Sequence, residues 1–286
     1  MTFDILPLVV SAATSFGTSY LANGEYGPIS TLSDLWYQKF GYLTEEVKDI
    51  QFRREQERTA KYVQHTENLT AEAIAEVPTD KLHEPRENIA RPAISAIEDY
   101  GSEEHTRKMF AKLIAASIDS RKDKIAQQSF VEIVKNMAPI DALVLKEAYE
   151  LNNYIEIGEI QKKFGKSGYT ILFTNLILKV SKNEDFQLKA SSLSNLERLG
   201  LIKLDYSTGL SDKSVYDQMK NTTIFKDFLN QNNHLISQHK LNPVEEENTI
   251  QYENWIDIIE SKIVIGEGYL SITPFGKDFC TICLSD

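Results

Sequence analysis

Cysteine is scarce in this chain of 286 residues, which has only Cys280 and Cys283. Two cysteines cannot form the disulfide framework of a small secreted domain, and no Lys or Arg precedes the first apolar segment as it would in a secretory leader. Positive charge is also in short supply, because 31 Lys and Arg face 42 Asp and Glu, for a formal net charge of −11. This balance argues against a general nucleic-acid coat or a polybasic membrane binder. We therefore expect a cytoplasmic protein.

The sequence contains no clear catalytic or nucleotide-binding motif. The nearest approach to a phosphate-binding loop consists of Gly158 and residues 165–167, Gly-Lys-Ser. Six residues separate the two glycines where such a loop has four, and the residues between them include the helix-like run EIQKKF. A phosphate cradle needs a tight loop that turns successive backbone N–H groups inward. We therefore predict no nucleotide site here.

The two cysteines stand at CxxC spacing, which is half of a zinc site or a redox pair. The histidines that could complete a zinc site are not paired at ligand spacing, except loosely His234 and His239. Two small core residues on a terminal helix are the simpler explanation. The sequence thus predicts no metal and no cofactor.

His83 stands beside Glu84 in the run KLHEP and could act as a general base. A general base needs a partner that faces the substrate, and none is visible in the sequence. The charged residues that follow are expected to form surface ion pairs instead; they are Arg86, Glu87 and Arg91. We predict no catalytic residue.

The segment 78–149 has the most regular helical pattern of the chain. Pro92 suits the first turn of a helix, where the missing N–H costs nothing. Gly101 is predicted to end that helix in the left-handed conformation. Ser102 is the predicted N-cap of the next helix.

Two more apolar stripes with three- and four-residue spacing follow. One lies around Phe130, and Pro139 separates it from the other. The sequence therefore predicts four tightly connected helices that form a central bundle over residues 71–150.

Residues 1–70 are predicted to form a helical arm. Residues 5–24 contain no charge and place apolar side chains on one helical face, with serine and threonine on the other. Packing on the protein's own core is the simpler explanation, and membrane contact is the alternative. Thr44 is the predicted N-cap of a long, highly charged helix, which we expect to be a solvated strut.

Residues 151–286 have a different sequence pattern, in which predicted helices alternate with short β-rich runs. The run SSLSNLERLG gives a helix one buried leucine face, Gly200 supplies a left-handed end, and a short strand follows. Two β-rich runs, 263–265 and 269–273, flank Gly-Glu-Gly and predict a hairpin. Thr273 is the predicted N-cap of a last helix. Helix, strand, hairpin and helix in this order predict a winged-helix-like α+β domain with a long insertion at about 205–262.

One surface of that domain is a candidate for binding. Residues 151–210 carry eight Lys and Arg against six Asp and Glu, so a small basic region exists in an acidic chain. In a winged helix that binds DNA, the helix before Gly200 would face the major groove. The candidate contacts are Lys189, Ser192, Asn195 and Arg198. Protein docking is favoured over nucleic acid, because the segment 189–204 has few positive charges.

Six blocks of the sequence resemble the abortive-infection alpha family of bacterial proteins. They are KLHEP, ARPAISAI, MFAKLIAASID, SFVEIVKNMAPIDALVL, SNLERLGLI and ITPFGKDF. The resemblance covers residues 78–150, about 190–204 and 269–283. It implies a bacterial intracellular protein that acts in abortive infection, in which an infected cell stops growing or dies before phage can multiply. It brings no catalytic residues.

Together these observations predict a mainly α protein that works by macromolecular interaction rather than catalysis, as a sensor or an effector of phage defence. The expected partner is a protein from phage or host, or a second copy of the chain. A winged-helix regulator that binds nucleic acid is the alternative, and an unrecognised hydrolase or nuclease is a third hypothesis.

Overall fold

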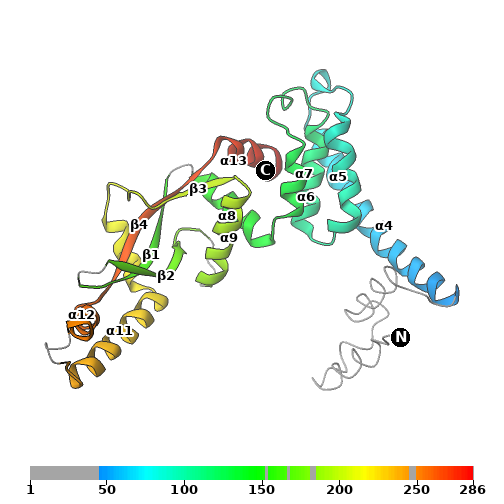
Figure 1. Cartoon of the computed structure of the whole chain (residues 1–286). Coiled ribbons are helices and arrows are strands. Elements are labelled where there is room, and N and C mark those ends of the chain that lie inside the picture. Colours follow the sequence, from blue (N-terminus) through cyan, green and yellow to red (C-terminus); the bar gives the residue numbers. More distant parts are fainter. Residues whose placement is uncertain (1–44, 152–153, 166–167, 181–184, 245–248, 286) are drawn as a thin grey trace.

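The computed structural model describes residues 45–151, 154–165, 168–180, 185–244 and 249–285. Figure 1 shows a helical body joined to a second body that contains a sheet. The predictions for residues 1–44, including the apolar segment 5–24 and the cap at Thr44, lie outside the described residues. The described part of the chain is mainly helical, as expected, and contains a four-stranded antiparallel sheet.

The helical body begins with the long helix that the charged run predicts. Its elements are α4 (Glu45–Ala75), the 3-10 turn η1 (Thr79–Lys81), α5 (Glu87–Tyr100), α6 (Glu104–Ala116), α7 (Ser129–Lys135) and α8 (Pro139–Leu151). α4 packs against α6, where Arg107 lies 5.6 Å from the ring centre of Tyr62 and donates to His65 at 3.1 Å. α4 crosses residue 70, so the boundary between arm and central domain stays a prediction.

The start of α5 differs from the prediction. The helix begins at Glu87, and Pro92 is its sixth residue rather than part of its first turn. Ile89 and Ala90 are buried, so the apolar face of the helix extends to the N-terminal side of the proline. That burial outweighs the helical hydrogen bond that Pro92 cannot donate.

The end of α5 also differs. Gly101 has a φ of −75°, so the left-handed end predicted there is wrong. Its N–H donates to the Ile97 carbonyl at 2.9 Å, and a Cβ at this position would lie 2.4 Å from the same oxygen. A close approach, not a positive φ, therefore requires glycine here. The N-cap of α6 is Glu103 and not Ser102.

The sheet has the strand order β2-β1-β4-β3. Its strands are β1 (Ile155–Lys163), β2 (Tyr169–Leu176), β3 (Ile202–Asp205) and β4 (Lys262–Ile272). The run EIQKKF, which looked helix-like, lies largely within β1, so that prediction was wrong. β1 pairs with β4 along its whole length, from Ile155 opposite Leu270 to Lys163 opposite Lys262. Long-range pairing of this kind overrides local preference.

The hairpin predicted at Gly-Glu-Gly is also wrong, because Gly266 and Gly268 lie inside the continuous strand β4. A Cβ on Gly266 would meet the side-chain amide of Gln161 at 2.2 Å, and one on Gly268 would meet the ring of Tyr206 at 2.6 Å. The glycines therefore make room for side chains that cross the strand. Residues 262–272 contain no turn that could form the wing of a winged helix.

Each face of the sheet is covered by a different set of helices. The main core joins Phe110 and Phe130 of the helical body to Ile157 and Leu270 of the sheet. The helices on this side are α9 (Phe186–Arg198), α13 (Pro274–Phe279) and the π-helix η3 (Cys280–Leu284). Phe130 meets Phe279 edge to face at a centroid distance of 5.3 Å, which fixes the last helix beside the helical body (Figure 1).

The predicted insertion covers the opposite face. It contains α10 (Ser214–Asp217), the 3-10 turn η2 (Gln218–Asn221), α11 (Thr223–Leu241) and α12 (Thr249–Ile259). A second core forms where Met219 and Phe225 of this segment pack on Ile160 of β1. A Cβ on Gly158 would lie 2.6 Å from the Met219 sulfur, so this glycine serves packing rather than phosphate binding. The helical spacing of Trp255 and Ile258 ends at Ile259, and Ile263 belongs to β4.

Two predicted helix boundaries are confirmed. Gly200 has a φ of 75°, and the N–H groups of Leu201 and Gly200 donate to the carbonyls of Leu196 and Glu197 at 3.0 and 2.9 Å. This pattern is a Schellman end. Thr273 caps α13 by accepting a hydrogen bond from the Gly276 N–H at 2.9 Å. Its hydroxyl also lies 2.7 Å from the Gly200 carbonyl, so the two helix ends are joined.

Candidate functional site

Two of the four predicted contact residues on α9 are buried. Lys189 and Ser192 are each 3% exposed. The Lys189 ammonium donates to the Val180 carbonyl at 3.3 Å and lies 5.3 Å from the ring centre of Phe186. In this conformation neither residue can touch a phosphate or a partner, because the protein itself covers both side chains.

Of the other two residues, Asn195 makes contacts within the protein and Arg198 lies on the surface. The side-chain amide of Asn195 donates to the Asp141 carboxylate at 2.7 Å and to the Asn136 carbonyl at 3.1 Å, which ties α9 to the start of α8. Arg198 is exposed and donates to the Asn195 side chain at 2.7 Å. Contact with a macromolecule through this segment stays a prediction, and it depends mainly on Arg198.

Cys280 and Cys283 are buried in the last turn of the chain that the structure describes. Burial raises the pKa of Cys280 to about 12 and raises the pKa of Cys283 further. Both thiols are therefore neutral at physiological pH, whereas the thiolate is the form that binds metal or attacks a disulfide. The described residues hold no group of three His, Cys, Asp or Glu side chains arranged to bind a metal ion.

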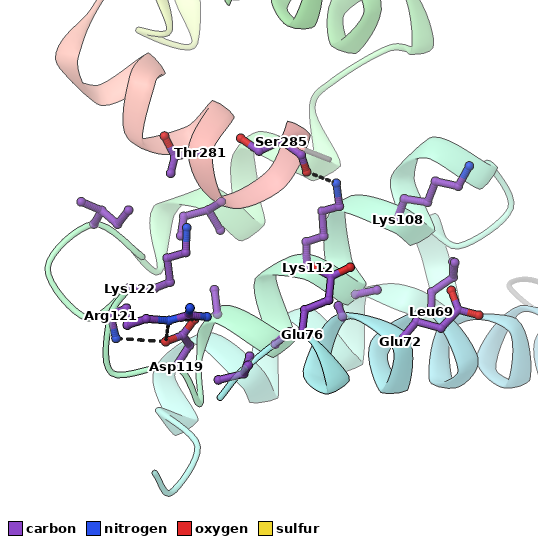
Figure 2. Close-up of a pocket in the computed structure, with 17 residues that line it drawn as sticks. Leu69, Glu72, Glu76, Lys108, Lys112, Asp119, Arg121, Lys122, Thr281 and Ser285 are labelled. Atoms are coloured by element: carbon purple, nitrogen blue, oxygen red, sulfur yellow. Dashed lines mark hydrogen bonds and ion pairs between the residues drawn. The ribbon is translucent and has the colours of Figure 1, made fainter. Parts of the chain in front are cut away.

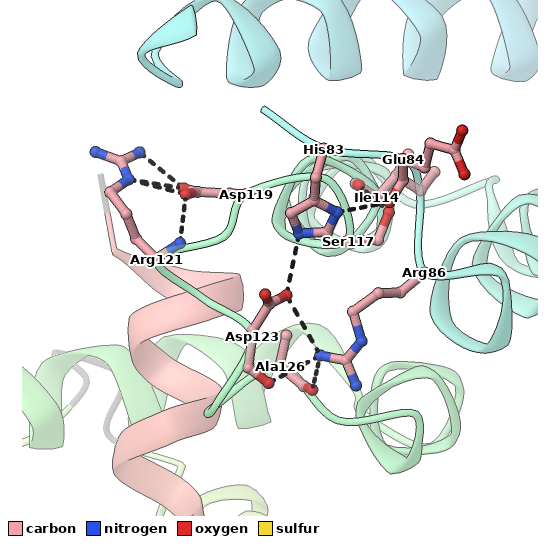
Figure 3. A network of polar contacts seen from close by, with 9 residues as sticks. All are labelled: His83, Glu84, Arg86, Ile114, Ser117, Asp119, Arg121, Asp123 and Ala126. Carbon is pink, nitrogen blue, oxygen red and sulfur yellow. Dashed lines mark hydrogen bonds and ion pairs between the residues drawn. The ribbon is translucent and has the colours of Figure 1, made fainter. Parts of the chain in front are cut away.

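His83 belongs to a polar network between residues 81–86 and the loop 117–126, which we call the clasp (Figure 3). The His83 ring lies 2.6 Å from the Glu84 carbonyl through Nδ1 and 3.1 Å from the Asp123 carboxylate through Nε2. Both neighbours are acceptors, so the imidazolium, which donates from both nitrogens, satisfies them best. The Glu84 carbonyl and then Asp123 raise the pKa of His83. This arrangement suits a structural cation better than a general base.

Backbone hydrogen bonds hold the clasp together. The His83 N–H donates to the Ile118 carbonyl at 3.1 Å, and the Arg86 N–H donates to the Ser117 carbonyl at 2.9 Å. The Arg86 guanidinium reaches the carbonyls of Asp123 and Ala126 at 2.9 and 3.1 Å (Figure 3). The predicted surface ion pair between Arg91 and Glu87 is also present, at 2.8 Å. The clasp thus fixes the loop that follows α6.

Asp119 belongs to the loop of the clasp and also lines a neighbouring groove. Its side chain is 3% exposed and accepts two parallel hydrogen bonds from Arg121, at 2.8 and 2.7 Å. These hydrogen bonds lower the pKa of Asp119, although burial opposes them. Bidentate pairs of this kind are among the stronger polar contacts in proteins. Arg121 is therefore held in a defined direction at the edge of the groove.

The groove itself has a volume of about 600 Å³ and lies between α4, α6, the loop 119–125 and the C-terminal helix (Figure 2). Its lining comprises Leu69, Glu72 and Ala73 from α4, Glu76 and Val77 directly after α4, Lys108, Ala111, Lys112, Ala115 and Ala116 from α6, Asp119, Arg121, Lys122 and Ile125 from the loop, and Thr281, Ile282 and Ser285 from the end of the chain. Three alanines of α6 contribute to the lining, and charged side chains stand around it.

The charges of the groove are separated by sign. Glu72 lies in the last turn of α4 and Glu76 directly follows the helix, and both are exposed. Lys108 and Lys112 stand one turn apart on α6, with Lys122 in the loop beyond them. Figure 2 shows Lys112 reaching from α6 to Ser285, whose carbonyl accepts its hydrogen bond. The groove therefore has an acidic side on α4 and a basic side on α6 and the loop.

Local sequence patterns do not predict this groove. Leu69, Glu72 and Ala73 lie on one face of α4, and Glu76 and Val77 continue the same three- and four-residue spacing past the end of the helix. That spacing was visible in the sequence, but the charge of the segment favoured a solvated strut. The identity of the facing surface, which comes from α6 and the chain end more than 30 residues away, needed the tertiary structure.

The fold and the groove define a class: a mainly helical protein with an open groove that is lined by charges of both signs. The chain belongs to the abortive infection alpha family, whose profile matches residues 54–283. Comparison with curated proteins found no match, and comparison with solved structures found none either. Along the described residues, no helix is both long enough and apolar enough to cross a membrane.

Proposed function

We propose that this protein acts in abortive infection by binding another macromolecule, as a sensor or an effector, and that the groove between α4 and the C-terminal helix is the binding surface. Membership of the abortive infection alpha family supports the defence role. The observation that carries the rest is the groove, which is open, partly lined by alanines and bordered by charges of both signs. An apolar centre with a polar, charged border is the general arrangement of a protein interface.

The partner we infer is a protein of the phage or the host, or a second copy of the chain. We place the protein in the bacterial cytoplasm, where phage multiply. Two buried, unpaired thiols fit a reducing compartment. The nucleic-acid alternative gains no support from Lys189 and Ser192, because both are buried.

The first experiment is phage challenge of cells that carry or lack the gene. We expect fewer plaques and earlier death of infected cells when the gene is present. Equal plaque numbers and equal survival would remove the defence role.

The second experiment tests the groove in the same cells. Changing Glu72→Lys together with Glu76→Lys reverses the acidic side of the groove, and both side chains are exposed, so the fold should tolerate the change. We expect loss of protection at equal protein level. Glu67→Lys is the matched control, because Glu67 is exposed on α4 but does not line the groove. Retained protection by the double variant would exclude the groove as the functional surface.

A further inference from the structure

The sheet has two outer strands, β2 and β3, and their outer edges differ. At the β3 edge, the Leu204 N–H donates to the Glu197 carboxylate at 2.9 Å, so a side chain of the protein occupies this donor. β3 has only four residues, and two of them, Lys203 and Asp205, form an ion pair at 3.4 Å. Short strands and charged side chains protect a sheet edge against pairing with another chain. The β3 edge is therefore closed.

The edge at β2 has neither kind of protection. This strand has eight residues, YTILFTNL, and none of them is charged. Its first three residues are exposed, and the exposed fraction is 58% for Tyr169 and 47% for Ile171. Among the described residues β2 pairs with β1 alone, so no strand lies along its outer side. The β2 edge is therefore open where it begins.

The pairing with β1 decides which backbone groups of β2 point outward. The Phe164 N–H donates to the Gly168 carbonyl at 3.0 Å, and the same register continues from Tyr169 to Ile171. Residues of an antiparallel pair alternate between those that bond to the neighbouring strand and those that do not. Gly168 and Thr170 therefore bond to β1, whereas Tyr169 and Ile171 direct their N–H and C=O groups towards the open edge. The register shifts after Ile171, so the regular part of the edge is short.

A second copy of β2 fits this short edge. Two copies that lie antiparallel about a two-fold axis at Thr170 place Tyr169 of each copy opposite Ile171 of the other. Thr170 then lies opposite its own counterpart. Pairs of an aromatic with a β-branched residue and pairs of two threonines are both favourable across strands. No like charges meet along this edge, although each chain carries a net charge of −11.

We propose that two copies of this protein pair through β2, with the two-fold axis at Thr170, and so join their sheets into one continuous antiparallel sheet. Tyr169 and Ile171 of the two copies form about four backbone hydrogen bonds, one for each outward N–H. Because the β3 edge is closed, the assembly ends at a dimer and does not continue into a fibre. The groove takes no part in this pairing, so the inference goes beyond the proposed function and does not rest on it.

The first test measures the oligomeric state of the full chain by sedimentation equilibrium over the micromolar range. We expect a reversible equilibrium between monomer and dimer. Ile171→Pro removes an N–H that makes no bond to β1, and proline is accepted where the N–H of an edge strand faces solvent. The fold should therefore persist, as circular dichroism can verify, while the dimer dissociation constant rises about tenfold or more. Ile171→Val is the matched control, because it keeps both the N–H and a β-branched side chain.

The second test establishes the register by cross-linking. Thr170 and its counterpart form a pair without hydrogen bonds, in which the Cα atoms lie about 4.5 Å apart. A disulfide joins Cα atoms roughly 4.4–6.8 Å apart, so Thr170→Cys should link two chains under mild oxidation. Thr174→Cys is the matched control, because this residue is exposed on the same strand but lies away from the axis. Cys280 and Cys283 are buried and should not react.

Each outcome decides for or against the pairing. A weaker dimer for Ile171→Pro, together with a covalent dimer for Thr170→Cys and none for Thr174→Cys, supports it. A chain that stays monomeric at every concentration would overturn it and leave the β2 edge to a different protein. A dimer that Ile171→Pro does not weaken, or that both cysteine variants link equally, would also overturn it, because another surface then holds the copies together.

Discussion

Tyr206 and Asn175 are joined by two hydrogen bonds. The Tyr206 hydroxyl donates to the side-chain oxygen of Asn175 at 2.9 Å and accepts from the Asn175 backbone N–H at 3.0 Å. Asn175 has a φ of 57°, in the left-handed region that asparagine tolerates better than most residues. Its amide also donates to Ser194 of α9 at 3.0 Å. The pair therefore connects the end of β2, the end of β3 and α9 through one partly buried network.

Removing the Tyr206 hydroxyl should destabilise the fold. Tyr206→Phe leaves the Asn175 N–H without its partner, and an unpaired buried donor costs about 1–3 kcal/mol. Urea denaturation followed by circular dichroism measures the free energy of unfolding. Tyr269→Phe is the matched control, because its half-buried hydroxyl makes only a long contact of 3.4 Å to Asp205. A loss for Tyr206→Phe no larger than for the control would contradict the importance of the network.

The same residue predicts a stability change at alkaline pH. Burial raises the pKa of Tyr206 from 10.0 to about 12. The folded chain therefore holds this proton more tightly than the unfolded chain, and the contribution of Tyr206 is complete below pH 10 and declines as the pH rises towards 12. Tyr206→Phe should show a shallower decline over that range. Parallel urea titrations at several pH values give the comparison, and identical slopes would rule the effect out.

For His83 we predict a change in stability between mildly acidic and neutral pH. The Glu84 carbonyl and Asp123 raise its pKa above the ordinary 6.5. A raised pKa means that its stabilising contribution is complete below the unfolded value and is lost as the pH rises through the folded value. The melting temperature of His83→Gln should therefore fall furthest below that of the unchanged protein at pH 5.5, and the gap should narrow by pH 8.

The control for this measurement is His234→Gln, which removes an exposed histidine on α11 far from the clasp. It should leave the melting temperature close to that of the unchanged protein throughout. Titration of the His83 ring protons by NMR provides an independent check. An apparent pKa at or below the ordinary value would show that the imidazolium is not the favoured form in the clasp.

Three glycines should differ in their response to alanine. Gly200→Ala should cost roughly 1–2 kcal/mol through backbone strain alone, because φ is positive while the nearest atom to a new Cβ lies 4.0 Å away. Gly268→Ala should cost about 1–3 kcal/mol through a clash with the Tyr206 ring and the Asp205 carbonyl. Gly266→Ala should cost less than Gly268→Ala, because the obstacle is the end of the flexible Gln161 side chain. Chemical denaturation of the three variants tests the order.

Substitutions at Asn195 and Arg198 should distinguish an effect on folding stability from an effect on nucleic-acid binding. Asn195→Ala removes the contact to Asp141 and Asn136 and should lower the free energy of unfolding by about 1 kcal/mol or more. Arg198→Ala is exposed and should cost about 0.5 kcal/mol or less. Gel shifts with DNA and RNA at low and high salt test the nucleic-acid alternative. No shift at low salt would end that alternative, whereas a salt-sensitive shift that Arg198→Ala weakens would support it.

The central helices could be predicted because their signals are local. The apolar stripe around Phe130, the proline at the start of α8 and the caps at Gly200 and Thr273 each act within a few residues along the chain. The predictions were wrong where the same residue type can serve two different structural roles. Glycine predicts a helix end at Gly101 and a turn at Gly266, but Gly101 makes room for the Ile97 carbonyl of its own helix and Gly266 makes room for the Gln161 side chain of β1.

The strand β1 also could not be predicted from local sequence. Its residues look helix-like in isolation, and only pairing with β4, about 100 residues later, makes them a strand. The candidate contact residues on α9 show the same limit, because Lys189 and Ser192 are buried. Sequence spacing placed Lys189 and Ser192 on a helix but could not say which face the rest of the protein would cover.

By itself, the sequence determined the helical content and the helix ends at Gly200 and Thr273, since these follow from side-chain periodicity and capping over short distances. The tertiary structure alone decided the strand order, the burial of Lys189 and the existence of the groove. Each of these depends on which distant segments meet, and that choice is made by the burial of apolar area across the whole chain. A local sequence pattern therefore does not show which distant segments meet.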